Sequence, residues 1–90
     1  KYGRMRRAYL KDHRPALYST LLLTEKLFPH LAEIDAACKT RLEIIEAEMM
    51  CREGVTEALK AADQMKWVRR RNSIHSRAEE IVLHELVYAE

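Results

Sequence analysis

The chain has 90 residues, too few to build two separate hydrophobic cores, so we expect a single domain over residues 1–90. Hydrophobic residues make up 48% of it and charged residues 33%, with only two glycines and two prolines, which favours helices over hairpin-rich sheets. Its apolar runs are too short to cross a bilayer, and two cysteines are too few for a disulfide framework. A β-protein and a membrane protein are therefore disfavoured, and a cytoplasmic location is expected.

The net charge is +2, but charge is unevenly distributed along the chain. Residues 1–14 hold six lysines and arginines and one aspartate, whereas residues 15–63 carry more acidic than basic side chains. Residues 64–78 are basic again, with five lysines and arginines and no carboxylate, and residues 79–90 are acidic. Charge segregated in this way indicates surfaces of opposite sign.

The first two helices are separated by a proline. We expect a helix over residues 2–13, because Pro15 disfavours the α-conformation at the residue before it. A second helix, over residues 15–27, accepts that proline in its first turn. Its apolar residues recur at helical spacing, which predicts a buried face. This face comprises Leu17, Tyr18, Leu21, Leu22 and Phe28.

The clearest periodicity in the chain follows Pro29. Apolar residues at steps of three and four define a helix over residues 30–53. Its end is set by Gly54, since glycine readily takes the left-handed conformation that terminates helices. The apolar stripe of this helix comprises Leu31, Ile34, Cys38, Leu42, Ile45 and Met49.

Two cap signals complete the pattern. Thr56 and Asp63 are typical N-caps, and they predict helices over residues 56–62 and 64–88. The apolar face of the last helix comprises Trp67, Val68, Ile74, Ala78, Ile81, Val82 and Leu86. Short connections favour antiparallel neighbours, so the expected fold is all-α, a compact antiparallel bundle of four to five helices. A homodimer that buries the remaining faces of the two longest helices is an open alternative.

No catalytic or metal-binding motif is found. His84 and Glu85 begin an HExxH-like zinc pattern, but Tyr88 stands where the second histidine ligand is required. The other histidines are scattered, neither cysteine has an adjacent histidine, and no glycine-rich phosphate loop occurs. We therefore expect no enzymatic activity, metal, cofactor or small-molecule substrate.

Two basic stripes are the strongest functional signal. The first basic stripe comprises Arg4, Arg7, Lys11 and Arg14, and the second basic stripe comprises Lys66, Arg70 and Arg77 with Arg69 beside them. Residues spaced by three and four share one helix face, and a cationic face can neutralise DNA phosphates. The alternative is a solvated face whose cations pair with glutamates of the same chain or of a dimer mate, such as Glu46 or Glu79. The residues alone leave both interpretations open.

Six motifs, spread in order over the chain, resemble the TnpV family of small proteins encoded on bacterial transposons and integrative elements. The motifs are Tyr9-Leu10-Lys11-x-His13-Arg14, His30-Leu31-x-x-Ile34-Asp35, Gly54-Val55-Thr56-Glu57-x-Leu59-Lys60, Met65-x-Trp67-Val68, Ala78-Glu79-Glu80 and Glu85-Leu86-Val87-Tyr88. Family members look longer at the N-terminus, so the resemblance implies that a first segment is lacking. It supplies no active-site motif.

The resemblance also implies an accessory part in element mobility, similar to that of an excisionase. Combined with the basic stripes, it predicts a non-catalytic protein that contacts DNA phosphates and modulates recombination or excision. The alternative function is a protein–protein adaptor that docks on an element-encoded recombinase, or on a host protein, through a helical face.

Overall fold

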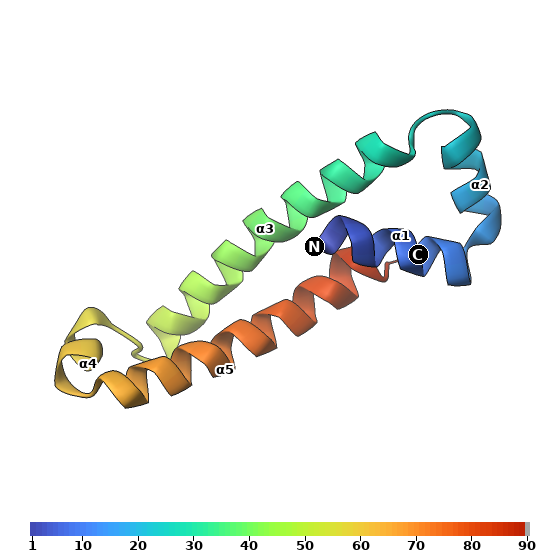
Figure 1. Cartoon of the computed structure of the whole chain (residues 1–90). Coiled ribbons are helices and arrows are strands. Elements are labelled where there is room, and N and C mark those ends of the chain that lie inside the picture. The colour runs from blue at the N-terminus through green and yellow to red at the C-terminus, as the bar shows by residue number, and fades with distance from the viewer. Residues whose placement is uncertain (90) are drawn as a thin grey trace.

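The computed structural model describes residues 1–89. Its elements are α1 (Tyr2–His13), α2 (Pro15–Leu23), α3 (Leu27–Arg52), α4 (Glu57–Ala62), α5 (Gln64–Val82) and the π-helix η1 (Leu83–Val87). The long helices α3 and α5 run antiparallel, with α4 at one end of the pair and α2 at the other (Figure 1). Helix α1 packs against α3 and η1 near the α2 end. The predicted all-α fold is confirmed, since residues 1–89 contain helices packed against one another and no strand.

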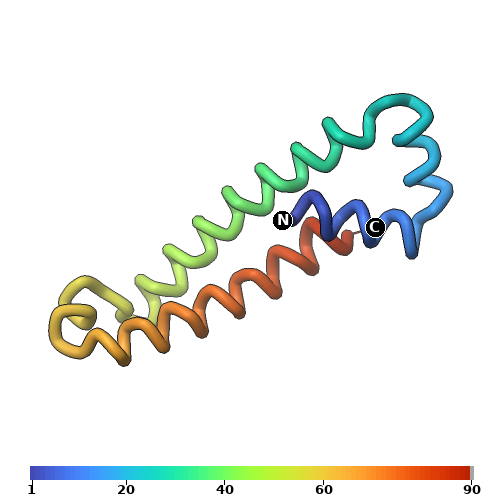
Figure 2. The backbone as a smooth tube through the Cα atoms, viewed as in Figure 1, coloured from blue at the N-terminus to red at the C-terminus, as the bar shows by residue number. Residues whose placement is uncertain are grey.

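The bundle is elongated. Its principal extents are 55 × 19 × 18 Å and its radius of gyration is 16.8 Å, against roughly 12 Å for a compact chain of this length. This differs from the compact shape expected, because α3 and α5 extend well beyond α1 toward α4 (Figure 2). Within residues 1–89, none of the helices combines the length and apolarity that crossing a membrane requires.

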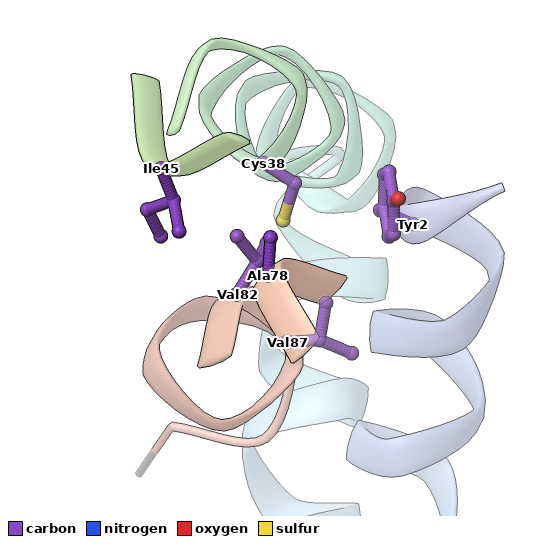
Figure 3. Close-up of a cluster of buried hydrophobic side chains, with 6 residues drawn as sticks. All are labelled: Tyr2, Cys38, Ile45, Ala78, Val82 and Val87. Carbon is purple, nitrogen blue, oxygen red and sulfur yellow. The ribbon is translucent and has the colours of Figure 1, made fainter. Parts of the chain in front are cut away.

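One hydrophobic cluster joins α1, α3 and the C-terminal helices. It comprises Tyr2 from α1, Cys38 and Ile45 from α3, Ala78 and Val82 from α5, and Val87 from η1 (Figure 3). Each of these residues is at most 6% exposed. The predicted stripe of the third helix therefore lies in or against the core, and burial raises the pKa of the Cys38 thiol.

The end of α3 follows the prediction. Gly54 has a φ of 68°, and the amide of Val55 behind it donates to the carbonyl of Met50 at 2.9 Å. These are features of a Schellman motif, in which a left-handed residue ends the helix. The predicted caps are confirmed too, since the Thr56 and Asp63 side chains accept from backbone amides at 3.2 and 3.1 Å.

The end of α2 repeats this motif without a glycine, and the predicted boundaries there were wrong. Glu25 takes the left-handed conformation at φ 60°, and the amide of Lys26 donates to the carbonyl of Leu21 at 2.9 Å. Helix α2 therefore stops at Leu23 instead of residue 27, and α3 starts at Leu27 with its proline in the first turn. Unlike glycine, glutamate does not favour the left-handed conformation, so its presence in the sequence does not predict a helix end.

The last helix was predicted to run unbroken to residue 88, and it changes its hydrogen bonding instead. The amide of Tyr88 donates to the carbonyl of Leu83, five residues back, at 2.8 Å. That spacing defines the π-helix η1, which follows α5 directly. The wider turn accompanies the full burial of Val87.

The predicted apolar face of α2 is not buried. No residue of α2 is buried, and Leu22 and Leu23 are 50% and 83% exposed. Phe28, at the start of α3, is 73% exposed. The chain reverses at Glu25, so this short helix lies across the end of the bundle instead of along it (Figure 1). On α5, Val68 and Ile81 are also more than one-third exposed, because α3 covers only one side of that helix.

Substitutions at the two left-handed positions are expected to have opposite effects. Gly54→Ala should lower the free energy of unfolding by about 0.5–1 kcal/mol, because the left-handed penalty of alanine exceeds its gain in the unfolded state. Glu25→Gly should raise it by a similar amount, about 0.5 kcal/mol, for the reverse reason. Urea denaturation followed by circular dichroism measures both. A neutral Gly54→Ala or a destabilising Glu25→Gly would contradict this assignment.

Candidate nucleic-acid interface

The N-terminus of α1 is held by Asp35 of α3. The Asp35 carboxylate accepts from the backbone amides of Tyr2 and Gly3 at 3.1 and 3.4 Å. The hydrogen bond from Lys39 lowers the pKa of Asp35 most, and the hydrogen bond from the Gly3 amide lowers it further, to about 2 from an ordinary value of 3.8. A Cβ on Gly3 would lie 3.1 Å from the Leu31 carbonyl oxygen, so glycine permits this close approach of the two helices.

A polar network then joins α1 to α5. The Tyr2 hydroxyl donates to Glu79 at 2.9 Å, and burial followed by this contact raises the pKa of Tyr2 to about 12. Lys1 Nζ lies 2.8 Å from the same carboxylate, and hydrogen bonds from Lys1 and Tyr2 lower the pKa of Glu79. His75 lies between two carboxylates, 2.5 Å from Glu46 and 3.5 Å from Glu79. These contacts fix which side of α1 faces the bundle.

Arg6 is the buried cation of α1 and serves the fold. Its Nη1 atom donates to the carbonyls of Val87 and Ala89 at 3.0 and 2.6 Å. Its Nε atom donates to His30 at 3.4 Å, and burial together with the nearby Arg6 charge lowers the pKa of that histidine. The charge pattern of the sequence grouped Arg6 with its basic neighbours, whereas helical spacing places it with Tyr2 and Leu10, which are also buried.

The first basic stripe lies on the opposite side of α1 from these anchors. Arg4, Arg7 and Lys11 are exposed, and with Ala8 they line a surface hollow of about 290 Å³. Arg14 is half-buried at the junction with α2. None of these four cations forms an ion pair within residues 1–89. The structure thus gathers three of them on one free face.

The second basic stripe is partly neutralised. Arg77 donates from both terminal nitrogens to Glu53, at 2.8 and 2.9 Å, and this pairing raises the pKa of Arg77 and lowers that of Glu53. Arg77 therefore fits the alternative in which basic side chains pair with glutamates of the same chain. The remaining members of the stripe, Lys66, Arg69 and Arg70, are exposed and make no ion pair in the described part of the chain.

The two stripes do not merge within one chain. Arg77 lies two residues from both His75 and Glu79, which is a rotation of about 200° around the helix. Because the Glu79 side of α5 contacts α1, the Arg77 side faces away from α1. Lys66 and Arg70 lie eleven and seven residues before Arg77, so they share its edge to within about 20°.

The family model of the transposon-encoded protein TnpV matches residues 1–87. The chain belongs to the TnpV family. No curated protein and no solved structure matches it. The expectation that a first segment is lacking finds no support in the family match. Membership identifies a transposon-encoded protein and assigns no role to any residue.

Substitutions of Arg6 and Arg7 test whether Arg6 holds α1 in the fold while Arg7 lies on its exposed side. Arg6→Ala should lower the free energy of unfolding by about 2–4 kcal/mol, because it removes the donor to the buried carbonyl of Val87 and the partly buried carbonyl of Ala89. Arg7→Ala is the matched control, and its effect should stay within about 0.5 kcal/mol because the side chain is exposed. Urea titrations of the two variants make the comparison. Equal effects would show that the assigned orientation of α1 is wrong.

Proposed function

We propose that this TnpV protein is an accessory, non-catalytic factor of its transposon that contacts DNA phosphates through basic helix faces and modulates recombination or excision. The observation that carries the proposal is the exposed set Arg4, Arg7 and Lys11, none of which forms an ion pair within residues 1–89. Family membership supplies the setting of a mobile element.

The arrangement of these cations suits a phosphate backbone. Arg4 and Lys11 are seven residues apart, about 10 Å along α1, which equals the axial rise of roughly three nucleotides of one DNA strand. Like charges at this spacing repel one another on an isolated helix, and phosphates would relieve that repulsion. Elsewhere on the surface, Lys39, Arg41 and Arg77 form ion pairs with carboxylates, whereas Lys26 and Arg52 are isolated cations that form no ion pair within residues 1–89.

The absence of catalysis belongs to the proposal as well. The side chains with clearly shifted pKa values have structural contacts that account for the shifts. Asp35 and Glu79 anchor α1, His30 lies against Arg6, and Glu53 pairs with Arg77. None of these groups needs a substrate to explain its environment.

A salt series on duplex binding tests the proposed function. The affinity for a labelled duplex should fall steeply as salt rises, and Arg4→Ala/Arg7→Ala/Lys11→Ala should lower the affinity measured at low salt. Fluorescence anisotropy measures both quantities. Lys26→Ala/Arg52→Ala removes two exposed cations outside the stripes and controls for the loss of positive charge elsewhere on the surface. Absent binding at low salt, or an affinity insensitive to salt, would refute the proposal.

The adaptor function remains a second candidate because of one observation. Helix α2 has no charged residue and no buried residue, so its leucines and the adjacent Phe28 form an exposed apolar end. An exposed apolar patch of this kind commonly marks a surface that contacts a partner. A recombinase encoded on the same element is the proposed partner.

The two candidates predict opposite mutant phenotypes. If the protein is an adaptor, Leu23→Ser/Phe28→Ser should abolish capture of the purified element-encoded recombinase in nuclease-treated samples, because both side chains are mostly exposed in the free chain. Arg4→Ala/Arg7→Ala/Lys11→Ala should leave that capture unchanged. Pull-down followed by quantitative blotting measures it. Capture that disappears on nuclease treatment of the wild-type sample would argue against the adaptor.

A further inference from the structure

We infer that the two basic stripes engage separate DNA duplexes, so that the protein bridges two DNA segments. The inference rests on the proposed contact with DNA and adds how the DNA is arranged around the protein. The inference is drawn from where the free cations lie. Those on α1 and those on α5 lie on different sides of the bundle and at different positions along its length.

The stripes are displaced along the length of the molecule. Tyr2 and Glu79 are in contact, and they mark a common level of α1 and α5. The segment from Lys66 to Arg70 is centred about 16 Å from that level toward α4, since α-helices rise about 1.5 Å per residue. Arg7 lies about 8 Å from it in the other direction, because α1 advances toward η1, where Arg6 meets Val87.

The stripes also occupy opposite sides of a body 18–19 Å thick. The α1 stripe points away from the bundle, whereas the edge with Lys66, Arg70 and Arg77 faces away from α1. A short duplex is stiff on this length scale, so one that lies along α1 cannot turn around the bundle to reach the other stripe.

The ionisable groups between the stripes are paired with one another. The carboxylates of Glu46 and Glu79 lie around His75, Glu79 also pairs with Lys1, and Asp35 pairs with Lys39. The cations of this region therefore have carboxylate partners and, unlike those of the stripes, are not free to bind phosphate. Each stripe has three exposed cations without an ion pair in residues 1–89, enough for separate phosphate contacts at low salt.

A capture assay at low salt tests the bridge. One duplex is fixed to beads, the protein is added, and recovery of a second, fluorescent duplex is measured. The full chain is compared with Arg4→Ala/Arg7→Ala/Lys11→Ala and with Lys66→Ala/Arg69→Ala/Arg70→Ala. All six side chains are exposed, alanine favours helix, and circular dichroism checks the fold of each variant.

We expect the wild-type chain to recover the second duplex and each triple variant to lose at least about nine-tenths of that recovery. Each variant should still bind a single duplex in solution, with a log–log salt slope close to that of the wild type, because the remaining stripe contacts its own duplex through the same three cations. Lys26→Ala/Arg52→Ala should bridge like the wild type, since it removes cations outside the stripes. Sedimentation velocity on the same samples gives the oligomeric state.

Several outcomes would overturn the inference. Binding of single duplexes without bridging by the wild type would do so while leaving the proposed function intact. Undiminished bridging by either triple variant would show that one stripe is sufficient, as in a dimer that presents the same stripe twice. Complete loss of single-duplex binding in one variant would show that the other stripe does not hold DNA. Absence of wild-type binding would remove the proposed function itself.

Discussion

The arrangement of the whole molecule depends on the seam between α3 and α5. Cys38 and Ile45 pack there against Ala78 and Val82, so each long helix buries one side only. A pair of helices cannot enclose a core alone, and α1 completes it over part of its length through Tyr2. Burying the Tyr2 side of α1 turns the opposite side of that helix, with its arginines, toward solvent. The exposure of the first basic stripe therefore follows from how the core is closed.

Much of the fold could be predicted from the sequence, because its signals are local. The caps at Thr56 and Asp63 and the stop at Gly54 depend on residue types with strong conformational preferences. The misplaced boundary at Glu25 depends on a residue that takes a left-handed conformation without favouring it. The exposed leucines of α2 were misjudged because helical spacing identifies an apolar face and does not show what covers it.

The candidate site divides in a similar way. Helical spacing placed Arg4, Arg7 and Lys11 on one exposed face, as the structure has them. It could not separate free cations from paired ones, since the partner of Arg77 is Glu53, on a different helix. Nor could it identify Arg6 as an anchor, because its acceptors Val87 and Ala89 lie at the other end of the chain. Whether a basic side chain has a partner depends on the tertiary structure. The contacts separate basic residues that stabilise the fold from those that remain free to bind a ligand.

The central proposal is that DNA binds to the exposed cations of α1 and α5 and that the apolar α2 does not form the binding surface. The most direct measurement is a titration of the isotope-labelled protein with a short duplex at low salt, followed in amide proton–nitrogen spectra. The account predicts shifts concentrated at Arg4, Arg7 and Lys11 and at Lys66 to Arg70, with little change around Glu46. Shifts confined to Leu22, Leu23 and Phe28, or no shifts at all, would contradict it.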